Sequence, residues 1–94
     1  MSYYILTYET ITTYLEKRAQ YREEHLNLAN KYVDLGQLIM GGALENPADK
    51  AVLVFKCDEE TVKKFVANDP YVKNGLVNHW HIRKWNVVVE NNKK

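Results

Sequence analysis

Residues 51–70 read AVLVFKCDEETVKKFVANDP and contain the pattern that decides the fold. The unbroken apolar run at 51–55 is typical of a central strand that is covered on both faces. Asp58 is a favourable helix N-cap, because its carboxylate can accept a hydrogen bond from an amide of the first helical turn. The stretch therefore predicts a buried strand that is followed at once by a helix.

The same helix shows its buried side and its end. Val62, Phe65 and Val66 recur at helical spacing and form one apolar stripe. The Asn68-Asp69-Pro70 sequence ends the helix, because a proline disfavours helical backbone in the residue before it. Residues 77–89 (VNHWHIRKWNVVV) are then predicted to form a long last strand.

The N-terminal half repeats this order of elements. Residues 3–8 (YYILTY) are rich in β-branched and aromatic side chains and are typical of a strand. A long helix is expected from Thr13 to Leu35, since Thr13 and Glu16 match a capping box and Gly36 can occupy the position after the helix end.

A short strand at residues 37–41 completes the order strand, helix, strand, strand, helix, strand. This order predicts an α+β, ferredoxin-like βαββαβ fold with a four-stranded antiparallel sheet, whose first and third strands are central. Helices on one face leave the other sheet face bare, and the last strand carries large apolar residues on both sides. We therefore expect the bare face to pair with a second copy, giving a homodimer or a higher oligomer.

Composition limits the possible classes of function. The 94 residues fit one domain, 1–94, with a frayed tail at about 90–94. A net charge of +1 gives no basic field for nucleic acid, and no apolar stretch is long enough for a membrane span. The lone Cys57 excludes a disulfide framework. The N-terminal residues show no signal-peptide pattern, so we expect a cytoplasmic protein. Gly41-Gly42 matches no nucleotide-binding pattern, and no cofactor is expected.

Three basic residues interrupt the apolar face of the first predicted helix. Arg18, Arg22 and His25 follow one another at i, i+4 and i+7 and therefore lie along one line. One interpretation is that the arginine stems pack while His25 is a satisfied, partly buried histidine. The other is a site in which His25 is an acid or base and the arginines bind a small anionic molecule.

Several motifs resemble those of the YCII family, in order and spacing over nearly the whole chain. They are EKR…R..HL (Glu16, Lys17, Arg18, Arg22, His25, Leu26), G-Q-L…GG (Gly36, Gln37, Leu38, Gly41, Gly42), DPY…GL (Asp69, Pro70, Tyr71, Gly75, Leu76) and the last-strand residues His79, Arg83 and Lys84. The chain departs from the family at Ala43-Leu44, where many members have a proline, so the resemblance does not extend to the shape of this loop.

The resemblance implies a dimeric α+β barrel in which two sheets pack face to face, with a His and an Asp as catalytic pair. Carried over, these are His25 and Asp69, and the proton abstraction they would perform is of lyase or isomerase type. Arg18 and Arg22 would then bind the substrate, together with three further residues of the matching segments. These are Gly42, Tyr71 and His79.

Alternatives remain open for these residues and for the function. The carboxylate of Asp69 can instead cap the amides that follow Pro70. His79 and His81 share one strand face, but the chain offers no clear third ligand and no metal site is expected. The alternative to an enzyme is a non-catalytic dimeric module that binds a metabolite or another protein.

Overall fold

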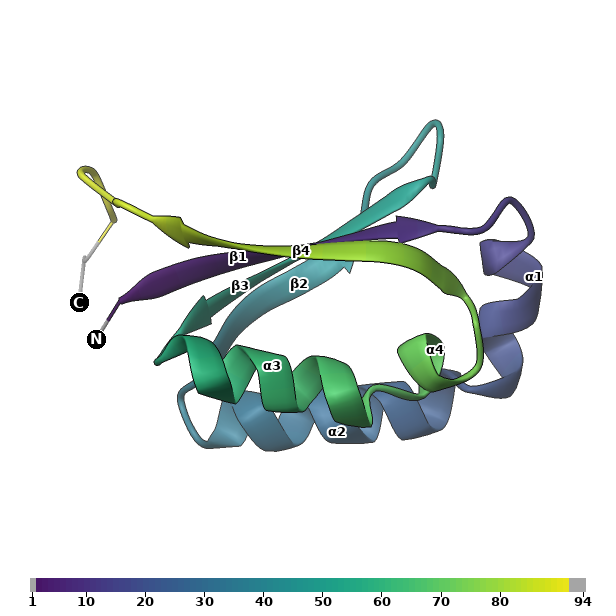
Figure 1. Ribbon diagram of the computed structural model, residues 1–94, viewed down its shortest axis with the longest axis horizontal. Coiled ribbons are helices and arrows are strands. Elements are labelled where there is room, and N and C mark those ends of the chain that lie inside the picture. Colours follow the sequence, from purple (N-terminus) through teal and green to yellow (C-terminus); the bar gives the residue numbers. More distant parts are fainter. Residues whose placement is uncertain (1, 92–94) are drawn as a thin grey trace.

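The computed structural model describes residues 2–91, which form one four-stranded antiparallel sheet with helices on a single face (Figure 1). The elements are β1 (Tyr3–Thr10), α1 (Tyr14–Lys17), the 3-10 turn η1 (Arg18–Gln20), α2 (Arg22–Asp34), β2 (Leu38–Ala43), β3 (Lys50–Lys56), α3 (Glu59–Asn68), α4 (Pro70–Lys73) and β4 (Val77–Trp85). The strand order is β2-β3-β1-β4, with β1 and β3 central. The α+β, ferredoxin-like prediction is confirmed.

The main core lies between the central strands and helices α2 and α3. Leu6 of β1 pairs with Leu53 of β3, and both side chains are buried. Phe55 packs edge-on against Phe65 of α3, with 5.2 Å between the ring centroids. Burial of each such side chain stabilises the fold by about 2 kcal/mol. The stripe predicted for α3 is confirmed, because its buried residues are Val62, Phe65 and Val66.

Both ends of α3 agree with the sequence. The Asp58 carboxylate accepts hydrogen bonds from the hydroxyl of Thr61 at 2.6 Å and from its amide at 2.9 Å. These bonds lower the pKa of Asp58, the hydroxyl bond most. At the other end Asp69 has extended backbone, with φ −72° and ψ 119°, as expected for a residue that precedes a proline.

The helix predicted for residues 13–35 is not continuous, and this prediction is wrong. The chain is divided at Tyr21, whose φ of −113° and ψ of 1° are not helical. Figure 1 shows α1 beyond the end of the sheet, whereas α2 runs beneath it. The break lets Tyr14 enter a second, smaller core with Tyr71 and Leu76, while α2 covers the main core.

The predicted capping box is also wrong. Within residues 2–91 the Thr13 side chain makes no capping hydrogen bond, because its ψ of 18° departs from the extended backbone that an N-cap needs. Its carbonyl accepts from the amides of Glu16 and Lys17 instead, at 3.1 and 3.0 Å.

Gly36 ends α2 as predicted. Its φ of +76° is left-handed, a conformation that glycine adopts without strain. The Gly36 amide donates to the carbonyl of Val33 and the Gln37 amide donates to that of Tyr32, both at 2.9 Å. This pair of bonds is a Schellman motif, which satisfies carbonyls that the helix end would leave free.

The last strand is shorter than the predicted range 77–89. It ends at Trp85, which pairs with Tyr3, the first residue of β1. Within residues 2–91 no ladder pairing continues beyond Trp85, and the strand ends there. Of the predicted frayed tail, residues 92–94 lie outside the described residues, whereas Glu90 accepts a hydrogen bond of 2.5 Å from the Tyr3 hydroxyl.

Among the described residues, the open sheet face opposite the helices is not covered by any other helix or strand (Figure 1). Strand register places one row across all four strands, consisting of Met40, Val54, Ile5 and Arg83. The adjacent row consists of Gly42, Val52, Thr7 and His81.

Within residues 2–91, no helix combines the length and the apolar character that crossing a membrane requires.

Candidate functional site

The candidate site is built around Asp69, which lies between α3 and α4. Pro70 occupies the first turn of α4 and fixes the chain direction there. As the N-cap of α4, Asp69 accepts a hydrogen bond from the Tyr71 amide at 3.0 Å through Oδ1. The capping role that the sequence left open is therefore present.

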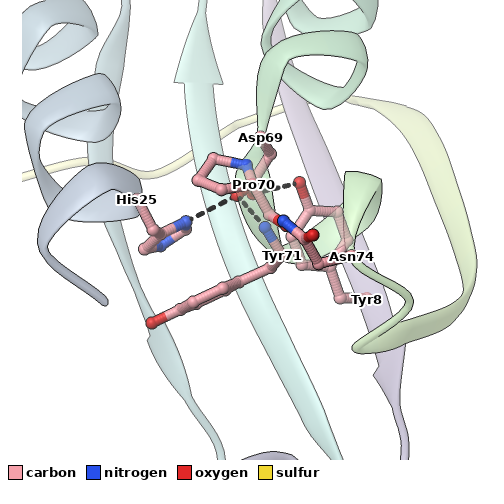
Figure 2. Close-up of polar contacts among 6 residues, drawn as sticks. All are labelled: Tyr8, His25, Asp69, Pro70, Tyr71 and Asn74. Atoms are coloured by element: carbon pink, nitrogen blue, oxygen red, sulfur yellow. Dashed lines mark hydrogen bonds and ion pairs between the residues drawn. The ribbon is translucent and has the colours of Figure 1, made fainter. Parts of the chain in front are cut away.

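The same carboxylate has two further donors, which come from different elements (Figure 2). Nδ1 of His25, on α2, lies 2.8 Å from Oδ1, and the hydroxyl of Tyr8, on β1, donates to Oδ2 at 2.7 Å. Asp69 is fully buried, with a relative exposure of 0%. A buried charge needs such partners, so the three donors favour an ionised carboxylate.

The orientation of His25 is fixed by ring contacts as well as by Asp69. Its imidazole stacks on the ring of Tyr71, with centroids 3.9 Å apart and an interplanar angle of 11°. The edge of Phe65 meets it from another side, at a centroid distance of 6.4 Å. With Asp69 ionised, Nδ1 of His25 carries the proton that it donates. In the neutral imidazole the other ring nitrogen, Nε2, then has a free lone pair.

His25 lies in the wall of a cavity of about 240 Å³. The remaining lining comes from α1, η1, α2, α4 and the sheet. These residues are Tyr8, Tyr14, Arg18, Arg22, Leu26, Ala29, Asn30, Val33, Leu38, Met40, Gly41, Gly42, Ala51, Leu53 and Tyr71. None of the described lining residues is acidic, so the cavity wall carries the positive charge of its two arginines.

Arg18 and Arg22 line the part of the cavity that also contains Tyr14 and Tyr71. The guanidinium carbon of Arg18 lies 5.5 Å from the centroid of the Tyr14 ring, a cation–π contact. Within residues 2–91 neither arginine has a carboxylate within 4.0 Å. Burial raises the pKa of the Tyr71 phenol, as does Tyr14, whereas the positive charges of Arg22 and Arg18 act in the opposite direction.

The Tyr8 phenol is held in its neutral form. Burial is the main cause that raises its pKa far above the ordinary value of 10.0, and the negative charge of Asp69 adds to the effect. Tyr8 is therefore the donor in its hydrogen bond with Asp69.

The structure brings together most of the residues that the sequence indicated. His25 and Asp69 are in contact, and the set that lines the same cavity with His25 is Arg18, Arg22, Gly42 and Tyr71. His79 lies elsewhere, on the open sheet face opposite Glu9. Its neighbour His81 has Nε2 3.2 Å from a carboxylate oxygen of Glu9. Within residues 2–91, no cluster of three or more histidine, cysteine or acidic side chains could hold a metal ion.

Two tyrosines are among the cavity-lining residues that the sequence analysis missed. Tyr8 and Tyr14 were assigned only to secondary structure, yet both line the cavity. Alternation along β1 gives a signal for Tyr8, because it shares the buried face with Leu6 and its hydroxyl must find a partner there. Tyr14 had no such signal, since the break in the helix decides where it points.

Comparison with known proteins places these observations in a family context. Residues 1–86 match the family model described as the YCII-related domain. No curated protein matches the chain.

Solved structures with the same fold include three that cover most of the chain. One is 5-chloro-2-hydroxyhydroquinone dehydrochlorinase (TftG) from Burkholderia phenoliruptrix in complex with 2,5-dihydroxybenzoquinone, with a TM-score of 0.75 and 18% identity over 89% of this chain and 93% of that chain. Another is a structural-genomics target from Agrobacterium tumefaciens, with a TM-score of 0.63 and 17% identity over 94% of both chains. An uncharacterized NIPSNAP domain protein from Burkholderia xenovorans has a TM-score of 0.60 and 14% identity over 99% of this chain and 100% of that chain.

Proposed function

This chain belongs to the YCII-related domain family, and we propose that it is an enzyme that removes a proton from a small, anionic organic molecule in a lyase-type or isomerase-type reaction. The observation that carries the proposal is the 2.8 Å contact between Nδ1 of His25 and the buried Asp69, at the wall of a cavity that also contains two arginines. The likeness to TftG, which is named a dehydrochlorinase, supports an elimination on this fold.

His25 would act as the general base through Nε2. It takes a proton from the substrate, and the Asp69 carboxylate stabilises the imidazolium that results. The electron pair of the broken bond stays on the substrate, where it either expels a leaving group from a neighbouring atom or forms a shifted double bond. The proton on Nε2 then passes to the leaving group, to the isomerised product or to water. Such a base contributes a factor of about 10²–10⁴ to the rate.

Arg18 and Arg22 would bind the negative charge of the substrate. A guanidinium group presents parallel N–H donors that match a carboxylate or a phenolate, and the absence of acidic residues among the described lining leaves both groups free for a ligand. Gly42 and Tyr71 belong to the same wall and complete the proposed substrate site. His79, on the open sheet face, could reach a ligand only through a partner at that face.

We also propose that the protein is a cytoplasmic homodimer whose open sheet faces pack together. The register rows that contain Ile5, Val52 and Val54 supply the apolar centre of this face. The single cysteine, Cys57, is buried and unpaired, which fits a reducing compartment.

A second candidate function is a non-catalytic module that binds a small molecule. The observation that favours it is the architectural part played by Asp69, which joins β1, α2 and α4 and caps the last of these. In that case the contact with His25 serves stability, and the cavity only binds.

The test compares binding with turnover. We would titrate the protein with 2,5-dihydroxybenzoquinone as an acidic probe, and assay chlorinated hydroxyhydroquinones and small carboxylic acids with an activated C–H bond for product formation. The enzyme proposal expects His25→Asn to lower turnover about a hundredfold or more while the protein stays folded. His81→Asn, the same change on the open sheet face, is the matched control and should leave the rate unchanged.

The two candidates give different results. Binding of the probe by the wild-type protein and by His25→Asn with equal affinity, without turnover of any compound in the panel, would overturn the enzyme and leave the binding module. Loss of probe affinity in Arg22→Gln would support the proposed anion site in either case, with Lys31→Gln as the control, since Lys31 is an exposed basic residue in the last turn of α2 outside the cavity lining.

A further inference from the structure

We infer that Tyr8 is a positioning residue of the His25–Asp69 pair: its hydroxyl holds Oδ2 of Asp69 and so keeps Oδ1 directed at Nδ1 of His25. The inference rests on the proposed function of His25 as a base. It adds a residue from the central strand β1 to a pair that otherwise belongs to the helical layer (Figure 2).

The geometry assigns separate tasks to the two oxygens of Asp69. Oδ1 faces the Tyr71 amide at 3.0 Å and the His25 imidazole at 2.8 Å. Within residues 2–91 the Tyr8 hydroxyl, at 2.7 Å, is the donor that reaches Oδ2. The two donors on Oδ1 already oppose rotation about the Cβ–Cγ bond, and the Tyr8 bond to Oδ2 adds a second point of attachment that restricts this rotation further. Tyr8 therefore helps to fix the plane in which the His25 proton is accepted.

The position of Tyr8 makes it a rigid donor. Its side chain is 1% exposed, and it lies on a central strand that is paired on both sides, with Ala51 of β3 and Trp80 of β4. The sheet therefore sets the place of the hydroxyl, whereas α2 sets the place of His25. Asp69 is held between these two layers, so the strand and the helix together define the distance across the pair.

The hydrogen bond from Tyr8 also sets how strongly Asp69 attracts the imidazole proton. The hydroxyl keeps its proton and always donates, so it draws part of the carboxylate charge toward Oδ2. Without this donor more negative charge faces His25, and the imidazolium is held more tightly. A base whose proton is held too tightly does not return it after the reaction. Tyr8 thus helps His25 to pass its proton on.

The experiment follows the titration of the His25 imidazole by NMR in the full chain and needs no substrate. In Tyr8→Phe the ring remains and the hydroxyl is lost. We expect the midpoint of the His25 titration to move to higher pH, because the carboxylate charge that stabilises the imidazolium is no longer shared with the Tyr8 hydroxyl. Tyr32→Phe is the matched control, because Tyr32 packs edge-on against Phe65 in the same core, whereas the hydrogen bonds of Asp69 in residues 2–91 come from Tyr8, His25 and Tyr71. The His25 midpoint should therefore not move.

A second variant keeps the test independent of any loss of stability in Tyr8→Phe. Replacement of Tyr8 by 3,5-difluorotyrosine retains the hydroxyl and makes it a stronger donor, so the His25 midpoint should move in the opposite direction. A midpoint that stays in place in both variants would overturn the role of Tyr8. Opposite shifts would establish it, even if no substrate were turned over and the proposed enzyme function failed. Turnover that needs His25, with a midpoint insensitive to Tyr8, would leave the enzyme and remove the positioning residue.

Discussion

Oδ1 of Asp69 lies 2.8 Å from Nδ1 of His25, although 44 positions separate the two residues in the sequence. The contact joins the start of α4 to α2, and the Tyr8 hydroxyl extends it to the central strand β1. Because Asp69 is fully buried, its charge is compatible with the fold only while these donors are in place. The same carboxylate therefore serves the candidate site and the stability of the domain.

Replacing Asp69 by Asn should lower the free energy of unfolding by about 1–3 kcal/mol. The shape is kept, but the amide removes the negative charge that strengthens three hydrogen bonds and turns an N–H group toward one of the donors. Urea unfolding monitored by circular dichroism measures the change. Asp34→Asn, an exposed residue at the end of α2, is the control and should stay within about 0.5 kcal/mol of the wild type. Equal stability of the two variants would show that the negative charge of Asp69 does not strengthen its three hydrogen bonds enough to stabilise the fold.

Replacing Gly36 by Ala should cost about 1–2 kcal/mol of stability. A methyl group at this position meets nothing within 4 Å, so the cost arises only from the left-handed backbone, with φ +76°. Gly42→Ala is a matched control, because its added methyl also meets nothing within 4 Å and its φ is not left-handed. Thermal unfolding of both variants measures the difference. A loss in Gly42→Ala as large as that in Gly36→Ala would show that the backbone conformation is not the cause.

The N-cap of α3 should give a pH-dependent contribution to stability. The pKa of Asp58 is lowered in the folded protein, first by the Thr61 hydroxyl and then by the Thr61 amide. A lowered pKa means that the contribution is complete above the ordinary value of 3.8 and is lost as the pH falls through the lower folded value. Thr61→Val removes the larger cause, so its thermal stability should fall below that of the wild type at neutral pH.

The difference between Thr61→Val and the wild type should narrow as the pH falls well below 3.8, where Asp58 is protonated in both proteins. Asp58→Ala supplies the control, because adding Thr61→Val to it should produce no pH-dependent difference. If the difference in thermal stability between the wild type and Thr61→Val did not change with pH, the Thr61 hydroxyl would act through packing and not through the Asp58 carboxylate.

Short stretches of sequence were sufficient to predict several helices and strands. Residue spacing and backbone preference were enough to predict three features: the apolar run of β3, the glycine at the end of α2, and the buried stripe of α3 formed by Val62, Phe65 and Val66. The strand order also followed, since β1 and β3 are the most apolar strands and lie in the centre. These features need no knowledge of contacts between distant residues.

The features that the sequence did not predict depend on tertiary contacts. The break at Tyr21 exists because α1 and α2 serve two separate cores, and no helical breaker marks it. Strand β4 stops at Trp85 because its partner β1 begins at Tyr3, a limit set by register. Tyr8 could be placed on a buried face, but only the folded chain shows that its acceptor is Asp69.

The open sheet face gives the prediction that tests the proposed dimer. Val54 lies in the row with Ile5, at the centre of this face, so face-to-face packing of two copies would bury it. Val54→Lys would place one charged group from each copy in that interface. We expect the association to weaken by about 3 kcal/mol, roughly a hundredfold. Light scattering coupled to gel filtration would then show a shift from a mass of two chains toward that of one chain, 11.0 kDa.

Leu35→Lys is the control for this shift, because Leu35 is 62% exposed at the end of α2, on the helical side of the sheet. It adds the same charge and removes a similar apolar group without touching the proposed interface, so its mass should equal that of the wild type. A wild-type protein that is a single chain at all concentrations would remove the dimer, and His79 would then have no route to a ligand in the cavity. A dimer that survives Val54→Lys but dissociates in Leu35→Lys would place the contact on the helical layer instead.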